Sequence, residues 1–153
     1  MQIRVHVPTQ TLALLDEAGA TIRKFVISTS KFGLGFAAGS QKTPTGKFRI
    51  ESKWGDGAPL GEIFVSRVAT GRIGTPEDET DHVQTRILWL EGLDLENTNT
   101  HSRYIYIHGT NGEHLLGTPA SHGCVRMSNQ DVVELFNLVE TGTVVSILDT
   151  DEA

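Results

Sequence analysis

Apolar and polar residues alternate along most of this chain, with the two-residue period of half-buried β-strands. Ile3, Val5 and Val7 alternate with polar residues until Pro8 ends the run. The same pattern predicts further strands over residues 11–16, 21–29, 47–51, 62–68, 86–91, 104–107 and 143–148, with a hairpin turn over 17–20. We therefore expect β-strands to dominate the fold.

One segment shows a helical period instead. Ser128 or Asn129 can cap its start, Asp131 lies in its first turn, and Gly142 is expected to end it. A broad apolar stripe lies between them, made of Val132, Val133, Leu135, Phe136, Leu138 and Val139. The prediction is a mainly β fold with one helix in its C-terminal half, built as a β-sandwich or a partly barrel-like sheet.

Two long segments carry neither period. Residues 30–46 are rich in glycine and close with Thr-Pro-Thr-Gly, and loops of this length are usually functional or mobile. Residues 70–82 are polar and include a run of acids between Glu77 and Asp81, which we interpret as a solvated surface excursion. Trp54 and Trp89 are expected to pack in the core.

Composition narrows the class of protein. The 153 residues, 38% of them hydrophobic, predict one domain over residues 1–153. A net charge of −6 argues against binding to nucleic acid. The single cysteine excludes an internal disulfide, and no run of the sequence is apolar enough for a membrane span. The N-terminal strand pattern has none of the features of a signal peptide, so either the protein is not exported this way or the chain has been trimmed.

The densest set of reactive side chains lies between Tyr104 and Met127. A predicted strand runs into His108, Gly109 and Thr110, and a loop follows with the sequence Ser-His-Gly-Cys-Val-Arg-Met over 121–127. An imidazole near Cys124 can take its proton, and Arg126 adds a fixed positive charge that favours the thiolate. Backbone N–H groups around Gly123 and Cys124 could form an oxyanion hole. The pattern therefore predicts a nucleophilic cysteine with a depressed pKa.

This segment closely resembles the active-site signature of L,D-transpeptidase catalytic domains, the YkuD family. Upstream segments extend the resemblance, namely Ser28–Lys31, Lys42–Phe48, Arg86–Leu90 and Arg103–Ile107. The last two resemble strands of the small single-domain Gram-negative members, and the resemblance covers nearly the whole chain.

The resemblance implies an enzyme that cross-links peptidoglycan stem peptides without a cofactor. Cys124 would attack the carbonyl of the third residue of a tetrapeptide donor, often diaminopimelate, and expel the terminal D-Ala. His108 would be the general base, oriented by the backbone carbonyl of Gly109, while His122 and Gly123 would shape the oxyanion hole. The residues expected to contact substrate are Arg126, Ser121, Tyr106 and Thr110.

The reaction can end in more than one way. An amine acceptor would give a 3–3 cross-link, whereas water would make the protein an L,D-carboxypeptidase. A cysteine peptidase or amidase with another substrate, and a non-catalytic cell-wall-binding domain, are the alternative classes. A metal site built from His108, His114, His122 and Cys124 matches no familiar zinc spacing. The resemblance implies a periplasmic location and no obligate protein partner, although without a visible signal a cytoplasmic location stays open.

Overall fold

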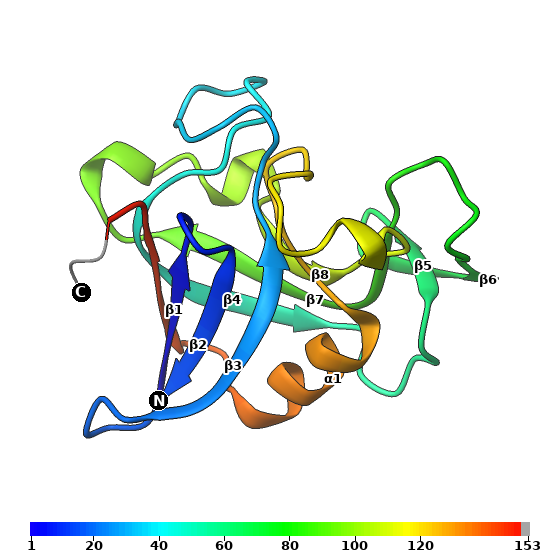
Figure 1. The fold of residues 1–153 in the computed structure, drawn as a ribbon, viewed down its shortest axis with the longest axis horizontal. Helices are drawn as coiled ribbons and strands as arrows, with labels where there is room; N and C mark the ends of the chain where they lie inside the picture. The colour runs from blue at the N-terminus through cyan, green and yellow to red at the C-terminus, as the bar shows by residue number, and fades with distance from the viewer. Residues whose placement is uncertain (151–153) are drawn as a thin grey trace.

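The computed structural model describes residues 1–150 and contains a ten-stranded sheet, one α-helix and three short 3-10 helices within them (Figure 1). The strands are β1 (Gln2–His6), β2 (Thr11–Leu15), β3 (Thr21–Ser28), β4 (Gly46–Trp54), β5 (Glu62–Val65), β6 (Val68–Ile73), β7 (Val83–Gly92), β8 (Tyr106–Gly109), β9 (Val125–Met127) and β10 (Val144–Leu148). The helices are α1 (Asn129–Leu138), η1 (Leu95–Asn97), η2 (His101–Arg103) and η3 (Glu113–Leu115). The sequence is acidic from Asp149 onward, and residues 151–153 of this tail lie outside the described part.

The sheet closes on itself. Its hydrogen-bonded order is β4–β10–β1–β2–β3–β9–β8–β7, and β7 pairs back with β4. Neighbouring strands are antiparallel except for the parallel pairs β1–β10 and β8–β9. The prediction of a mainly β fold is confirmed. Of the two expected forms, a β-sandwich and a partly barrel-like sheet, the structure has the barrel-like one.

The alternating pattern fills the interior of this barrel. Ile3 and Val5 of β1 are fully buried beside Leu12 and Leu14 of the paired strand β2. Intervening residues of β1 point outward and are only partly buried, as the two-residue period requires.

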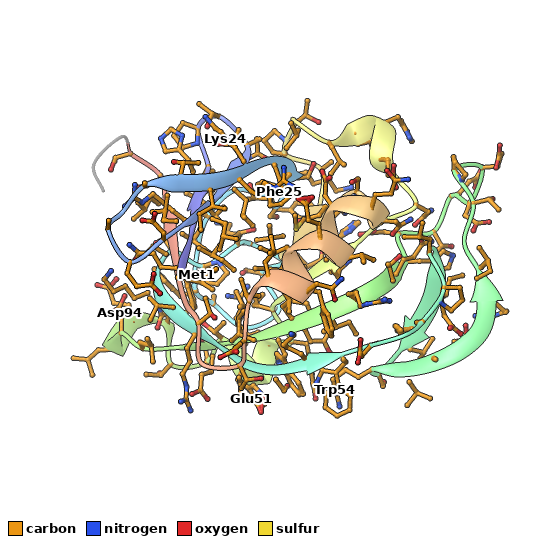
Figure 2. All side chains as sticks on the ribbon, turned by 90° about the horizontal axis from the view of Figure 1, so that it is seen from below. Met1, Lys24, Phe25, Glu51, Trp54 and Asp94 are labelled. Carbon is orange, nitrogen blue, oxygen red and sulfur yellow. The ribbon has the colours of Figure 1, made fainter. Side chains whose placement is uncertain are left out.

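The helix α1 packs against β7 and β8, as Figure 2 shows for its course along β7. The Ser128 hydroxyl accepts a hydrogen bond from the backbone N–H of Asp131, so Ser128 is the N-cap. Val132 and Leu135 are fully buried in the same core as the barrel strands. Contrary to expectation Gly142 does not end the helix: α1 stops at Leu138, and Gly142, with φ of +95°, forms the turn before β10.

Strands β5 and β6 form a hairpin, and β5 pairs with the N-terminal part of β7 in the barrel. The excursion expected over residues 70–82 is therefore partly wrong, because β6 continues to Ile73 and only residues 74–82 form a loop. The core prediction is correct for Trp89, which is 8% exposed, but wrong for Trp54, which is 40% exposed and lies at the outer surface beside this hairpin (Figure 2).

Two strands next to the reactive segment differ from the prediction. The strand expected over 104–107 begins only at Tyr106, because Tyr104 takes a left-handed conformation with φ of +58° at the end of η2. Residues 125–127, expected within a loop, form β9 and pair with both β8 and β3. The signature segment is thus built into the barrel wall.

Candidate active site

The parallel pair β8–β9 brings the predicted reactive residues together. Its register sets His108 opposite Arg126, and Ile107 opposite Val125. Ile107 and Val125 are fully buried in the barrel core. Because successive side chains alternate between faces, His108 and Arg126 lie on the opposite face, together with the residues two positions before each, Tyr106 and Cys124.

The thiol of Cys124 is held by backbone groups. The N–H of Tyr106 donates to Sγ at 3.3 Å, and the thiol donates to the carbonyl oxygen of Tyr104 at 3.4 Å. The side chain packs against a buried cluster that includes Trp89 and Tyr106. The sulfur therefore lies at the N-terminal end of β8, where the N–H of Tyr106 is directed at it.

The turn that carries the cysteine is fixed from within and from the glycine-rich loop. The Ser121 hydroxyl donates to the carbonyl of Cys124 at 2.6 Å and accepts from the N–H of Gly123 at 3.3 Å. Thr43 donates to the carbonyl of Gly123 at 2.9 Å, which ties the loop over 30–45 to the turn. Gly123 has φ of +124°, a conformation that side chains disfavour. The N–H of Gly123 thus has a long protein contact that an oxyanion could replace.

His108 is 3% exposed and its ring is held by the adjacent backbone. Nδ1 lies 2.6 Å from the carbonyl oxygen of Gly109. A carbonyl can only accept, so Nδ1 carries the proton and Nε2 of the neutral ring is the acceptor. A Cβ at Gly109 would lie 2.8 Å from the backbone carbonyl oxygen of Gln84 and 2.3 Å from Oδ1 of Asn129, so the position favours glycine. This is the ring contact that the family resemblance implies, and no hydrogen bond within residues 1–150 joins the ring to Cys124.

The electrostatics favour a neutral pair. Cys124 is half-buried, yet dense packing removes water from the sulfur, and this burial raises the pKa of the thiol to about 11 despite the N–H of Tyr106. Burial likewise lowers the pKa of His108, against the opposing effects of Gly109 and Asp81. The expected depressed cysteine pKa is therefore wrong for this state of the site, because desolvation outweighs the nearby arginines.

Asp81 is the residue at this site that the sequence did not indicate. Its Oδ2 lies 2.6 Å from Nη2 of Arg126 and 3.0 Å from Nδ1 of His122. Burial acts to raise the pKa of Asp81, but the charges of His108 and Arg126 and the hydrogen bonds from His122 and Arg126 lower it below its usual value. The acidic loop expected to be solvated thus supplies the counter-charge of the active-site arginine.

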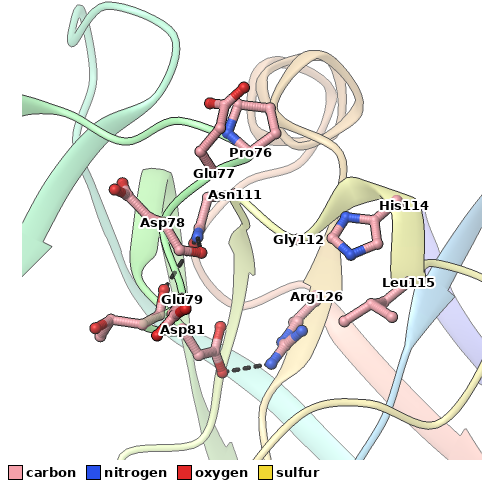
Figure 3. Close-up of a pocket in the computed structure, with 11 residues that line it drawn as sticks. Pro76, Glu77, Asp78, Glu79, Asp81, Asn111, Gly112, His114, Leu115 and Arg126 are labelled. Carbon is pink, nitrogen blue, oxygen red and sulfur yellow. Dashed lines mark hydrogen bonds and ion pairs between the residues drawn. The ribbon is translucent and has the colours of Figure 1, made fainter.

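Arg126 is itself deeply buried, with its side chain 4% exposed. Asp81 is its one ion-pair partner within residues 1–150, and its buried Nε has no hydrogen-bond partner there. A cavity of about 380 Å³ lies beside this pair, between the acidic loop and the segment after β8 (Figure 3). Its wall is formed by residues 76–81, Asn111, Gly112, His114, Leu115 and Arg126.

A second cavity, of about 290 Å³, opens beside the cysteine turn and is lined in part by Arg103, Tyr104 and His122. His122 belongs to this wall and to the contact with Asp81, and its side chain is 43% exposed. The two cavities have different lining residues, and of the two only the second is lined by a residue of the cysteine turn, His122.

The residues expected to contact substrate differ in availability. Ser121 and Thr110 are buried, and their hydroxyls bind backbone groups, Thr110 through the N–H of Gly112 at 3.0 Å. The hydroxyl of Tyr106 instead accepts from Nη1 of Arg67 at 3.0 Å. Ser121 and Thr110 therefore shape the loops, and their contact with substrate stays a prediction. No three His, Cys, Asp or Glu side chains of residues 1–150 are grouped to hold a metal ion.

Residues 1–147 match the family described as the L,D-transpeptidase catalytic domain, YkuD. Among curated proteins, the chain is 42% identical over 65 residues to a putative L,D-transpeptidase, YqjB of Bacillus subtilis, covering 42% of this chain and 35% of that protein. It is 47% identical over 47 residues to a probable L,D-transpeptidase, YbiS of Escherichia coli, covering 31% of this chain and 15% of that protein.

Solved structures share the fold. An L,D-transpeptidase from Xylanimonas cellulosilytica superposes with a TM-score of 0.63 at 19% identity, covering 95% of this chain and 59% of that one. L,D-transpeptidase 3 from Mycobacterium tuberculosis, solved with a faropenem-derived adduct, gives 0.61 at 19% identity, covering 96% and 59%. The chain spans about a third or less of these curated relatives and somewhat over half of these structures.

Proposed function

The chain belongs to the L,D-transpeptidase catalytic domain family, and on that premise we propose that it transfers peptidoglycan stem peptides through a thioester on Cys124. The donor is a tetrapeptide whose third residue, such as diaminopimelate, carries the reacting carbonyl. The acceptor is an amine of a second stem peptide. This chemistry needs the nucleophile, base and backbone donors already described, and it needs no cofactor.

The first half of the reaction forms the thioester. The Cys124 thiol passes its proton to Nε2 of His108 as sulfur attacks the carbonyl carbon. The bond to the amine of D-Ala then breaks, and His108 returns the proton to that departing amine. In the second half the acceptor amine attacks the thioester and loses a proton to His108, which protonates the departing sulfur. The first half-reaction leaves a neutral imidazole beside the Cys124 thioester, and the second restores the free thiol.

The observation that carries this proposal is the hydrogen bond between Nδ1 of His108 and the carbonyl of Gly109, at 2.6 Å. It leaves Nε2 of the neutral ring as the acceptor, on the face of β8–β9 that also carries Cys124. The lowered pKa of His108 and the raised pKa of Cys124 keep the resting pair neutral, so the proton moves during the attack.

Water can replace the amine acceptor at the same thioester, which would make L,D-carboxypeptidase activity a side reaction. The cavity lined by Tyr104 and His122 offers a substrate one approach to the cysteine turn. A peptidoglycan substrate favours the periplasm as the place of this reaction. No helix within residues 1–150 has the length and apolar character to cross a membrane.

The test is mass spectrometry of purified tetrapeptide muropeptide after incubation with wild type, Cys124→Ala or Cys124→Ser. We expect a dimer lighter than two monomers by one D-Ala from wild type alone. A tripeptide product without a dimer would show a carboxypeptidase instead. Dimer formed by either variant would contradict the role of Cys124, and intact substrate with all three proteins would contradict the proposed substrate.

A further inference from the structure

Three arginines lie around the cysteine, and two of them are already engaged. Arg126 pairs with the carboxylate of Asp81. Arg103 donates to the backbone carbonyls of Gly35 and Lys42 and to the hydroxyl of Ser40. A substrate carboxylate at either arginine would therefore share the guanidinium with an acceptor of the protein.

The third arginine, Arg67, lies at the tip of the β5–β6 hairpin. Ser66 and Arg67 have φ of +48° and +65° in a two-residue turn between the paired residues Val65 and Val68. Such turns need positive φ at both central positions and normally use Asn or Gly there, because other side chains are strained. The turn therefore holds Arg67 in a strained backbone conformation.

The guanidinium of Arg67 is stacked among aromatic rings. Its Cζ lies 4.2 Å from the ring centre of Trp89, 5.7 Å from that of Tyr104 and 5.8 Å from that of Trp54. Nη1 donates to the hydroxyl of Tyr106 at 3.0 Å. Stacking fixes the plane of the guanidinium while its edge N–H groups stay able to bind, which suits a planar carboxylate.

This guanidinium also lacks a counter-charge. Within residues 1–150 no Asp or Glu forms an ion pair with Arg67, and its remaining N–H donors have no hydrogen-bond acceptor there. It lies one tyrosine side chain from the nucleophile, because the hydroxyl of Tyr106 binds Arg67 while the N–H of Tyr106 binds Sγ of Cys124.

We propose that Arg67, stacked on Trp89 and Tyr104, is the carboxylate anchor of the donor peptide. The carboxylate is the one at the far end of the side chain of the third residue, as in diaminopimelate. The carboxylate of the departing D-Ala is too close to the reacting carbonyl to reach across Tyr106. This inference rests on the proposed function and names the group by which the site selects its donor.

The test compares Arg67→Met with wild type on three donors. One has diaminopimelate as third residue, one has lysine there and so lacks the side-chain carboxylate, and one has diaminopimelate with a C-terminal carboxamide. Arg72→Met is the matched control, since Arg72 lies exposed on the same hairpin and its loss changes the net charge equally. Loss of a charge-assisted contact should raise KM for the first and third donors about 10- to 100-fold with little change in kcat.

The lysine donor should show no difference between wild type and Arg67→Met. An equal rise in KM for all three donors would make Arg67 a packing residue, and an effect lost only with the carboxamide would assign it to the departing D-Ala. Either result overturns the inference.

A binding arm separates this inference from the proposed function. Donor binding to Cys124→Ala, with and without Arg67→Met, is followed by tryptophan fluorescence, because Trp89 stacks directly under the guanidinium. Binding weakened by Arg67→Met supports the inference even if wild type turns over no donor. Equal binding contradicts the inference even if the enzyme is active. The thermal unfolding midpoint and near-UV circular dichroism of each variant show whether the fold is kept.

Discussion

Replacing Asp81 by asparagine isolates the charge that neutralises the buried arginine of the site. Asparagine keeps the shape of the side chain and one acceptor oxygen, but it leaves the cation of Arg126 buried without an ion-pair partner. The Arg126 side chain is 4% exposed and that of Asp81 is 24% exposed. The substitution therefore tests whether the acidic loop is part of the site or a solvated excursion.

The magnitude follows from this burial. Removing one partner of a fully buried ion pair costs about 3–5 kcal/mol, and the partial exposure of Asp81 lowers the expectation to about 2–3 kcal/mol. The contact with His122 adds little, because that ring is 43% exposed. With a urea m-value of about 2 kcal/mol per molar, the unfolding midpoint should fall by about 1–1.5 M.

The assay is urea unfolding followed by tryptophan fluorescence at pH 7, with Glu79→Gln as control. Glu79 lies exposed on the same loop, forms no ion pair within residues 1–150 and changes the net charge equally, so its midpoint should stay near that of wild type. A double-mutant cycle with Arg126→Met then gives the coupling between Asp81 and Arg126. Equal midpoints for Asp81→Asn and Glu79→Gln would refute the reasoning.

The pH dependence gives a second check on the same variant. The pKa of Asp81 is lowered in the folded protein, so its stabilising effect is present above the unfolded carboxyl pKa of about 3.9 and is lost as the pH falls through the folded value. The difference between wild type and Asp81→Asn should therefore shrink below about pH 4. A difference that persists unchanged in acid would show that charge is not its cause.

Further predictions concern the reacting pair and the packing beside it. Because the pKa of Cys124 is raised to about 11, its alkylation by iodoacetamide should be slow at pH 7 and accelerate steadily to high pH, and a plateau near neutrality would instead show a preformed thiolate. Because burial lowers the pKa of His108 from its usual value of 6.5, the ring should become protonated only below pH 6.5. The value of kcat/KM should therefore fall only below that pH, and a fall that begins above it would contradict the effect of burial. Gly109→Ala should lower stability by more than about 2 kcal/mol in urea unfolding because its Cβ would clash with the backbone carbonyl of Gln84 as well as with Asn129, whereas Gly112→Ala, whose nearest contact would be 3.5 Å, should be tolerated, and equal stabilities would refute the clash.

The sequence predicted those parts of the site that are local in the chain. His108 and Arg126 meet because β8 and β9 are neighbouring strands of one sheet, and their register sets these two residues opposite each other. The alternating pattern likewise predicted most strands and the interior of the barrel. The exceptions are short strands such as β9, whose three residues are too few to show a period.

Asp81 was missed for a physical reason. A run of acids with proline and threonine has the composition of a solvated loop, and nothing local distinguishes the one carboxylate that turns inward. The signal that could have found it is the pairing of β7 with β8, in which Gln84 lies opposite Gly109. The residues just before β7 must then lie near the residues just after β8, where a buried Arg126 needs a counter-charge.

The position of Arg67 could not be predicted from the sequence for a different reason. A two-residue turn formed by Ser66 and Arg67 has none of the usual glycine or asparagine signal, so no hairpin tip is predicted there from the sequence. The position of Arg67 depends on the stack with Trp89, which only the folded barrel reveals.

The most direct test of the account is the intact mass of the protein after brief incubation with the tetrapeptide donor and no acceptor, followed by an acid quench. Wild type should gain the mass of the donor minus one D-Ala, located on the peptide that contains Cys124 and released by hydroxylamine as a thioester. Cys124→Ala should gain nothing. An adduct on another residue, or D-Ala released without any adduct on Cys124 in wild type and variant alike, would contradict the claim that this cysteine carries the acyl group.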